Sequence, residues 1–254
     1  MRKRRQQSRT TAGAHGEGEA KRERRALGEE RREFLGVIHC RFEGNDPIFI
    51  DLNDLSDRYN EDGRFITLPG YEWSGNTPLG GDRNVFFTDE GRQIRRSSHA
   101  LIPDRRDLHT DANTARELFE AFAATDEDVV CYAHCGGRYA DIKYAHDGRF
   151  EKSMEIHSSW GTFEWLMQDA FEMNYRVGIV SNSDGHKGRP GASYPGASLF
   201  GAVGGLTCFL LPELSRSALI DCLRKRRHYG TTGGRVGIDV RAAFPAGGTL
   251  YHDD

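Results

Sequence analysis

Apolar residues along the chain fall into short blocks with two different periods. Blocks suited to strands cover residues 34–40, 47–51, 64–70, 84–87, 129–134, 153–157, 177–180 and 205–211. Helical patterns begin near Leu52, Thr114, Thr162 and Ser215. Because strands and helices alternate with short connections, this order predicts an α/β domain with a mainly parallel sheet, open or closed into a barrel.

Two of the helices carry start or stop signals, and a third has a clear apolar face. Thr114–Glu117 has the Thr-x-x-Glu pattern of a capping box. The helix after Thr162 has apolar residues at i, i+3, i+4, i+7 and i+8, which predicts one buried face. That face consists of Phe163, Leu166, Met167, Ala170 and Phe171. Ser215 is a typical N-cap for the last helix, and Gly230 is its expected stop.

The first 33 residues differ from the rest because Arg, Lys, Glu, Gly and Gln dominate them. We expect a disordered or solvated tail over 1–33 and one α/β domain over 34–254. The basic run Met1–Arg5 leaves open an arm that binds nucleic acid, which would make binding steeply dependent on salt. The whole chain has a net charge of -3, which does not favour nucleic acid as its partner.

The remaining composition excludes several classes of protein. None of the five cysteines forms a CxxC pair, so neither a zinc ribbon nor a disulfide framework is expected. No apolar run reaches the roughly 18 residues of a membrane span. The basic N-terminus has no apolar segment after it, unlike a secretory signal. These features predict a cytoplasmic protein with no membrane partner.

Candidate chemistry is concentrated in the stretch Ser183–Arg189, which follows the apolar run 177–180. Asp184 and His186 are two residues apart, so in an extended chain both side chains point the same way. Such a pair is suited to binding a metal or to acid/base catalysis. The alternative is an aspartate that caps a turn and an exposed histidine.

Other expected strands also end in a carboxylate or an imidazole, namely Glu72, His134 and His157. Parallel sheets place their sites at the carboxyl ends of strands. A mixed set of histidines and carboxylates suits Zn, Mn or Fe. Arg138, Lys187 and Arg189 lie near these ends and are either phosphate-binding groups or surface charges.

Several short segments together resemble the PHP (polymerase and histidinol phosphatase) superfamily over roughly residues 48–242. They are Gly70–Ser74, Gly81–Phe87, Ala133–His134, Glu155–Thr162, Ser183–His186 and Tyr229–Arg235. The similarity is to a poorly characterised branch with GYEW, SD-x-H and TTG-x-R motifs. No GxSxG elbow, Walker loop or GxGxxG segment after a strand competes with this interpretation.

The resemblance implies a distorted (β/α)7 TIM-like barrel that hydrolyses phosphoesters with a metal-activated water at the strand ends. Glu72 matches the bridging glutamate of the family, and His134 matches the histidine of a later strand. Asp184 and His186 match the closing D-x-H pair. His157 stands on a strand where many members carry no ligand.

The chain also departs from the family pattern. The H-x-H motif expected on the first strand is absent, and His39 in Val37–Cys40 is the candidate for a degraded second-strand ligand. Asp82 stands where the branch often has a histidine. We therefore expect one or two divalent ions, and a barrel that is incomplete at its N-terminal strand.

Two functions remain open from the sequence. The first is a metal-dependent hydrolase acting on a small-molecule phosphoester. The second is a catalytically depleted or truncated PHP-like scaffold that binds a ligand or partner without turnover. An open sheet edge would favour self-association or a partner chain that supplies the missing segment.

Overall fold

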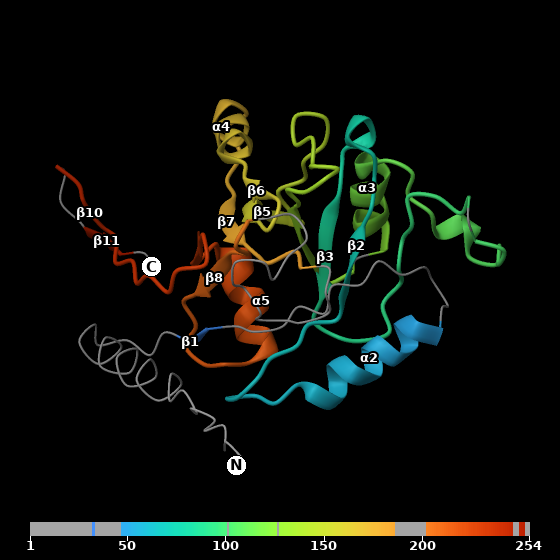
Figure 1. Ribbon diagram of the computed structural model, residues 1–254, viewed down its shortest axis with the longest axis horizontal. Helices are drawn as coiled ribbons and strands as arrows, with labels where there is room; N and C mark the ends of the chain where they lie inside the picture. Colours follow the sequence, from blue (N-terminus) through green and yellow to red (C-terminus); the bar gives the residue numbers. More distant parts are fainter. Residues whose placement is uncertain are drawn as a thin grey trace, which may run out of the picture. The chain divides into compact units, whose positions relative to one another are not determined.

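The computed structural model describes residues 32–33, 47–100, 102–125, 127–185, 202–245 and 249–251. Its helices are α2 (Pro47–Tyr59), α3 (Ala115–Thr125), α4 (Glu164–Glu172) and α5 (Arg216–Lys225), with short 3₁₀ turns at Thr77–Leu79 and Leu108–Thr110. Its strands are β1 (Arg32–Glu33), β2 (Gly70–Trp73), β3 (Arg83–Phe87), β4 (Val129–Ala133), β5 (Glu151–Ser158), β6 (Gly161–Thr162), β7 (Gly178–Ser181), β8 (Leu206–Phe209), β9 (His228–Thr231), β10 (Arg241–Ala243) and β11 (Thr249–Tyr251). The protein is therefore an α/β protein, as predicted (Figure 1).

The largest sheet has the order β2-β3-β4-β5-β6, and β7 pairs with β5. Strands β4, β5 and β7 pair in parallel, as the sequence predicted. Strand β3 is antiparallel to both β2 and β4, so the prediction of a mainly parallel sheet is wrong for this half. The reason is the short β2–β3 connection, residues 74–82, because a parallel crossover needs about a dozen residues or more.

A smaller sheet has the order β1-β8-β9, and β10 pairs with β11. Strand β9 lies directly against β7, since a Cβ added at Gly230 would come within 2.3 Å of Ser181 Oγ. Within the described residues the strands form no closed barrel. No helix in that part of the chain has the length and apolar character needed to cross a membrane.

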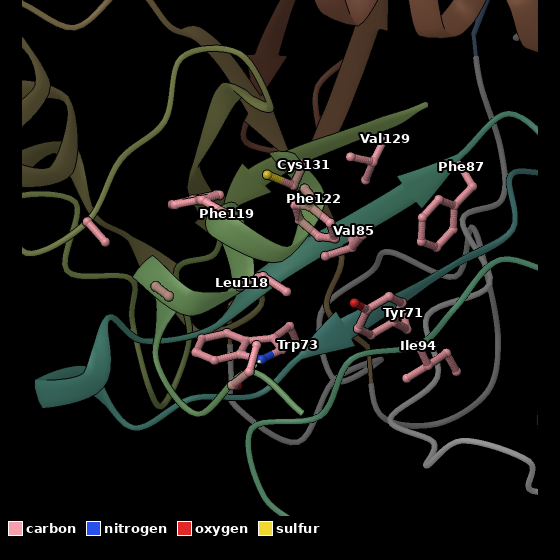
Figure 2. Packing of buried hydrophobic residues seen from close by; sticks show 13 residues of the cluster. Tyr71, Trp73, Val85, Phe87, Ile94, Leu118, Phe119, Phe122, Val129 and Cys131 are labelled. Atoms are coloured by element: carbon pink, nitrogen blue, oxygen red, sulfur yellow. Dashed lines mark hydrogen bonds between the residues drawn. The ribbon is translucent and has the colours of Figure 1, made fainter. Parts of the chain in front are cut away.

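Helix α3 covers one face of the β2–β4 region (Figure 2). Tyr71, Trp73 and Val85 from the strands point toward Leu118 and Phe122 from the helix. The helix begins as predicted, because Thr114 Oγ1 accepts a hydrogen bond from the backbone N–H of Glu117 at 3.2 Å. This face is a hydrophobic core.

The opposite face of the same strands packs against α5. Val130 and Tyr132 alternate with the α3-facing residues of β4 and join a cluster with Leu219 and Leu223. Burial on both faces explains why β4 is a continuous apolar run. Ser215 caps α5 as predicted, but the helix ends at Lys225, where Arg226 takes a left-handed conformation, and not at Gly230.

Three further sequence expectations are wrong in part. Residues 47–51 belong to helix α2 and not to a strand. Residues 64–69 form isolated bridges at Phe65 and Leu68 and no strand, although Ile66 and Leu68 are buried in the cluster that packs against α5. In α4, Leu166 and Ala170 are buried as expected, whereas Phe171 is 68% exposed.

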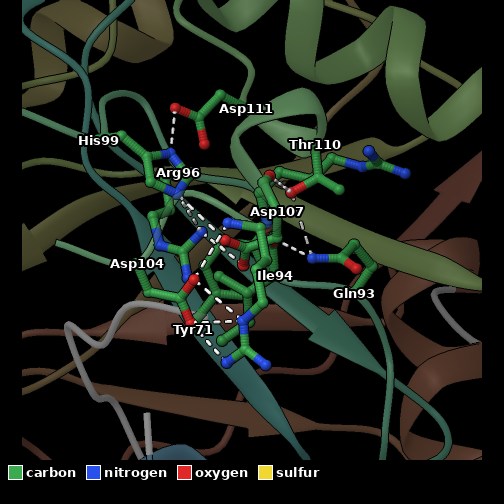
Figure 3. A network of polar contacts seen from close by, with 11 residues as sticks. Tyr71, Gln93, Ile94, Arg96, His99, Asp104, Asp107, Thr110 and Asp111 are labelled. Carbon is green, nitrogen blue, oxygen red and sulfur yellow. Dashed lines mark hydrogen bonds and ion pairs between the residues drawn. The ribbon is translucent and has the colours of Figure 1, made fainter. Parts of the chain in front are cut away.

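The connection between β3 and α3 is held by buried polar groups (Figure 3). His99 lies between two acids, with Nδ1 at 2.6 Å from Asp111 and Nε2 at 3.1 Å from Asp107. Arg96 also pairs with Asp107 at 2.8 Å. The hydrogen bond with Asp111 raises the pKa of His99, so the network stabilises the imidazolium form.

Candidate metal centre

One edge of the large sheet gathers the acidic and imidazole side chains. The carboxyl ends of β2, β4, β5 and β7 point the same way, and the reversed β3 begins at that edge. Along β2, Tyr71 and Trp73 face α3, so alternation directs Glu72 to the other face. His134 continues the alternation of Val130 and Tyr132 to that same face.

Glu72, Asp82 and His134 form a compact group whose ligand atoms all lie within 4.8 Å of one another. His134 Nε2 lies 3.8 Å from Glu72 Oε1 and 3.5 Å from Asp184 Oδ2. The side chains are only 4–11% exposed. Three carboxylates and one imidazole therefore converge in a largely buried space.

Asp82 is fixed by the backbone on both sides. Its N–H donates to Arg138 O at 2.9 Å, and its carbonyl accepts from the N–H of His134 at 3.2 Å. Its Oδ1 atom is buried and has no hydrogen-bond partner in the described structure. Burial, followed by the nearby Glu72, raises the pKa of Asp82 to about 8, while Arg138, 3.5 Å away, opposes that shift.

His134 is held between acids on its two ring nitrogens. Nδ1 lies 2.7 Å from Glu155 Oε2, on the side away from Glu72 and Asp184. Burial alone would lower the pKa of His134, but Glu155, Asp184 and Glu72 together raise it well above its usual value. The ring is thus in a strongly negative environment.

Asp184 follows β7 in a left-handed conformation, with φ of 45°. Its carbonyl accepts from Ser159 Oγ at 3.2 Å, which links the loops after β5 and β7. Gly136 lies close against the side chains of His134 and Asp184. A Cβ there would lie 2.6 Å from His134 Nε2 and 3.4 Å from Asp184 Oδ2.

The other candidates from the sequence are placed differently. His157 does not join the group, because its Nδ1 contacts Thr162 Oγ1 at 2.7 Å and its Nε2 contacts Val203 O at 2.8 Å. Arg138 borders the group with a side chain that is 35% exposed. The remaining candidates lie outside the described residues, and they are His39, His186, Lys187 and Arg189.

Sequence reasoning did not single out Glu155, which is 1% exposed. Its Oε2 accepts from the Cys135 N–H at 3.0 Å, and its Oε1 accepts from Asn182 Nδ2 at 3.0 Å. The available signal was alternation along β5, which puts Glu155 on the opposite face from the buried Met154. A glutamate at that position, beside a strand ending in His134, is a natural partner for the imidazole.

Comparison with known proteins places the chain in a family. Residues 17–151, which are 135 of the 254 residues, match the family described as "Protein of unknown function (DUF3604)". The chain belongs to this DUF3604 family. The match includes Glu72, Asp82, His134 and Arg138, so much of the candidate centre lies in the part of the chain that defines membership.

An uncharacterised protein of Chlamydia pneumoniae is 23% identical over 221 residues. That match covers 78% of this DUF3604 chain and 34% of the relative, so the chain spans about one third of the relative's length. A solved two-domain protein from Bacteroides vulgatus, described as containing a predicted PHP-like metal-dependent phosphoesterase, is 12% identical, with a TM-score of 0.43. The likeness covers 73% of this chain and 49% of the other, and at that score it does not define a shared fold.

Proposed function

We propose that this DUF3604 protein binds one or two divalent metal ions and hydrolyses a small-molecule phosphoester. Glu72, Asp82, His134 and Asp184 would hold the metal. The observation that carries the proposal is the buried group of Glu72, Asp82 and His134, whose ligand atoms lie within 4.8 Å of one another. Groups of this composition bind Zn, Mn or Fe.

The chemistry of the donors fits a cation. Asp82 Oδ1 is buried with no hydrogen-bond partner in the described part of the chain, which costs free energy unless a further ligand occupies the space. Glu72 and Asp82 are also close enough to raise the pKa of Asp82 through their mutual repulsion. A divalent ion would relieve both features by accepting the two carboxylates.

The residues around the group suit a phosphoester. When bound, a divalent ion lowers the pKa of water and neutralises phosphoryl charge. Arg138 is beside Asp82 and about one third exposed, so its guanidinium can also bind an anionic oxygen of the substrate. His186 and the (β/α)7 barrel belong to the proposal through the PHP resemblance. Lys187 and Arg189 belong to it because they follow Asp184 closely in the sequence, and the cytoplasmic location rests on composition.

Elemental analysis of protein purified without chelator tests the metal site. We expect at least one equivalent of Zn, Mn or Fe in the wild type and its loss in Glu72→Gln and Asp82→Asn. Glu127→Gln is the matched control, because Glu127 is a largely buried acid that pairs with Arg95 away from the group. Metal retained at full occupancy in both site variants would refute the assignment.

A phosphoester screen of the metal-loaded protein tests the reaction. We expect turnover that chelator removes and that Asp82→Asn abolishes. Bound metal without turnover on any phosphomonoester or phosphodiester would refute the hydrolase and favour the binding scaffold.

A further inference from the structure

The carboxylate of Glu155 joins three strands of the sheet behind the candidate centre. It stands on β5, receives the N–H of Cys135 after β4, and receives the side-chain amide of Asn182 after β7. Its remaining contact is His134 Nδ1 at 2.7 Å. Both strands that Glu155 joins to β5 are followed by a proposed metal ligand, His134 after β4 and Asp184 after β7.

We infer that Glu155 is a positioning residue that fixes the tautomer and ring angle of His134, so that Nε2 is presented to the metal. This inference rests on the proposed metal site. A carboxylate can only accept hydrogen bonds, so at 2.7 Å His134 Nδ1 must carry the proton. The neutral ring that binds a metal then has its lone pair on Nε2, which faces Glu72 and Asp184.

A second neighbour of Nδ1 competes with this assignment. Asn84 Nδ2 lies 3.1 Å from the same nitrogen, and a proton donated from Asn84 would require the opposite tautomer. The bond to Glu155 is shorter and involves a charged acceptor, so it is the stronger of the two. A half-turn of the Asn84 amide presents Oδ1, which has no partner in the described structure, and removes the conflict.

Glu155 itself is held rigidly. Asn182 Nδ2 reaches both Glu155 Oε1 at 3.0 Å and Tyr132 Oη at 2.9 Å. Glu155 is 1% exposed, so water does not compete for its oxygens. Tyr132, Asn182, Glu155 and His134 therefore form a largely buried chain of hydrogen bonds that ends at His134 Nδ1, the ring nitrogen opposite the metal-facing Nε2.

The zinc dissociation constant, measured by chelator competition, tests the inference in the full chain. We expect Glu155→Gln to weaken zinc binding by about 10- to 100-fold, because a neutral amide orients the ring less well. Glu127→Gln is the matched control and should bind zinc like the wild type. If Glu155→Gln binds zinc as tightly as the wild type, the inference is overturned and the proposed metal site stands.

A second readout does not depend on metal. In zinc-free protein labelled with ¹⁵N-histidine, the His134 Nδ1–H should give a low-field, slowly exchanging proton resonance, identified by its absence in His134→Gln. The resonance should be lost in Glu155→Gln. If the wild type binds no Zn, Mn or Fe, the proposed function fails and this resonance alone decides the inference: loss in the variant supports it and an unchanged signal overturns it.

Asn182→Ala provides an independent variant in case Glu155→Gln does not fold. It leaves Glu155 in place but removes the donor to Oε1. We expect a smaller loss of zinc affinity, of several-fold, together with faster exchange of the His134 proton. Wild-type zinc affinity and exchange in Asn182→Ala would overturn the hydrogen-bond chain.

Discussion

Substitution of Gly136 by alanine is the sharpest steric test of the centre. The added Cβ would lie 2.6 Å from His134 Nε2, whereas ordinary contacts begin near 3.4 Å. The imidazole must therefore retreat by about 0.8 Å, several times the roughly 0.2 Å tolerance of metal–ligand distances. The φ angle of Gly136 is outside the left-handed region, so alanine itself causes no backbone strain.

We expect Gly136→Ala to weaken zinc binding by about 100-fold, the order of loss that follows a 1 Å misplacement of an active group. Chelator competition measures the affinity, and thermal unfolding of the zinc-free protein reports whether the fold is intact. Gly148→Ala is the matched control, because its Cβ would make only a 3.6 Å contact with His146. A folded Gly136→Ala variant with wild-type zinc affinity would refute His134 Nε2 as a ligand.

Two predictions concern stability. Glu151→Ala leaves the fully buried Arg83 without its acid partner, so urea unfolding should show a loss of about 3–5 kcal/mol; a loss below 1 kcal/mol would contradict this. Burial lowers the pKa of His228 to about 4, below the usual 6.5, so protonation of the unfolded chain reduces stability as pH falls from 6.5 toward 4. The free energy of unfolding of the wild type should fall by up to about 3 kcal/mol relative to that of His228→Gln over that range. A difference between the two proteins that does not change with pH would contradict this prediction.

The sequence predicted much of the centre because strand ends are visible in the hydrophobic pattern. Glu72, His134 and Asp184 each follow a recognisable apolar run, and the structure brings all three to one edge. Asp82 was suggested only by the family resemblance. It stands at the start of β3, and it reaches that edge because β3 is antiparallel to its neighbours.

The sequence predictions failed where the hydrophobic pattern of a segment does not determine how that segment pairs with other strands. Ile66 and Leu68 alternate like strand residues, but their burial in the α5-side core requires no ladder. Glu155 was missed because its role depends on the alignment of β4 with β5, which includes a register shift at Cys131/Tyr132. Periodicity within one segment carries no information about such an irregularity.

The side chains of residues 82–84, at the start of β3, point alternately to the two faces of the sheet. Arg83 points toward the α3 side, where it pairs with Glu151 and donates to the carbonyls of Gly80 and Gly81. Asp82 and Asn84, on either side of it, face the candidate centre. Because Arg83 holds the strand through contacts on the other face, we expect that Asp82 can be replaced without displacing β3. In the proposed metal site, we therefore expect Asp82→His to shift the preference toward Zn over Mn.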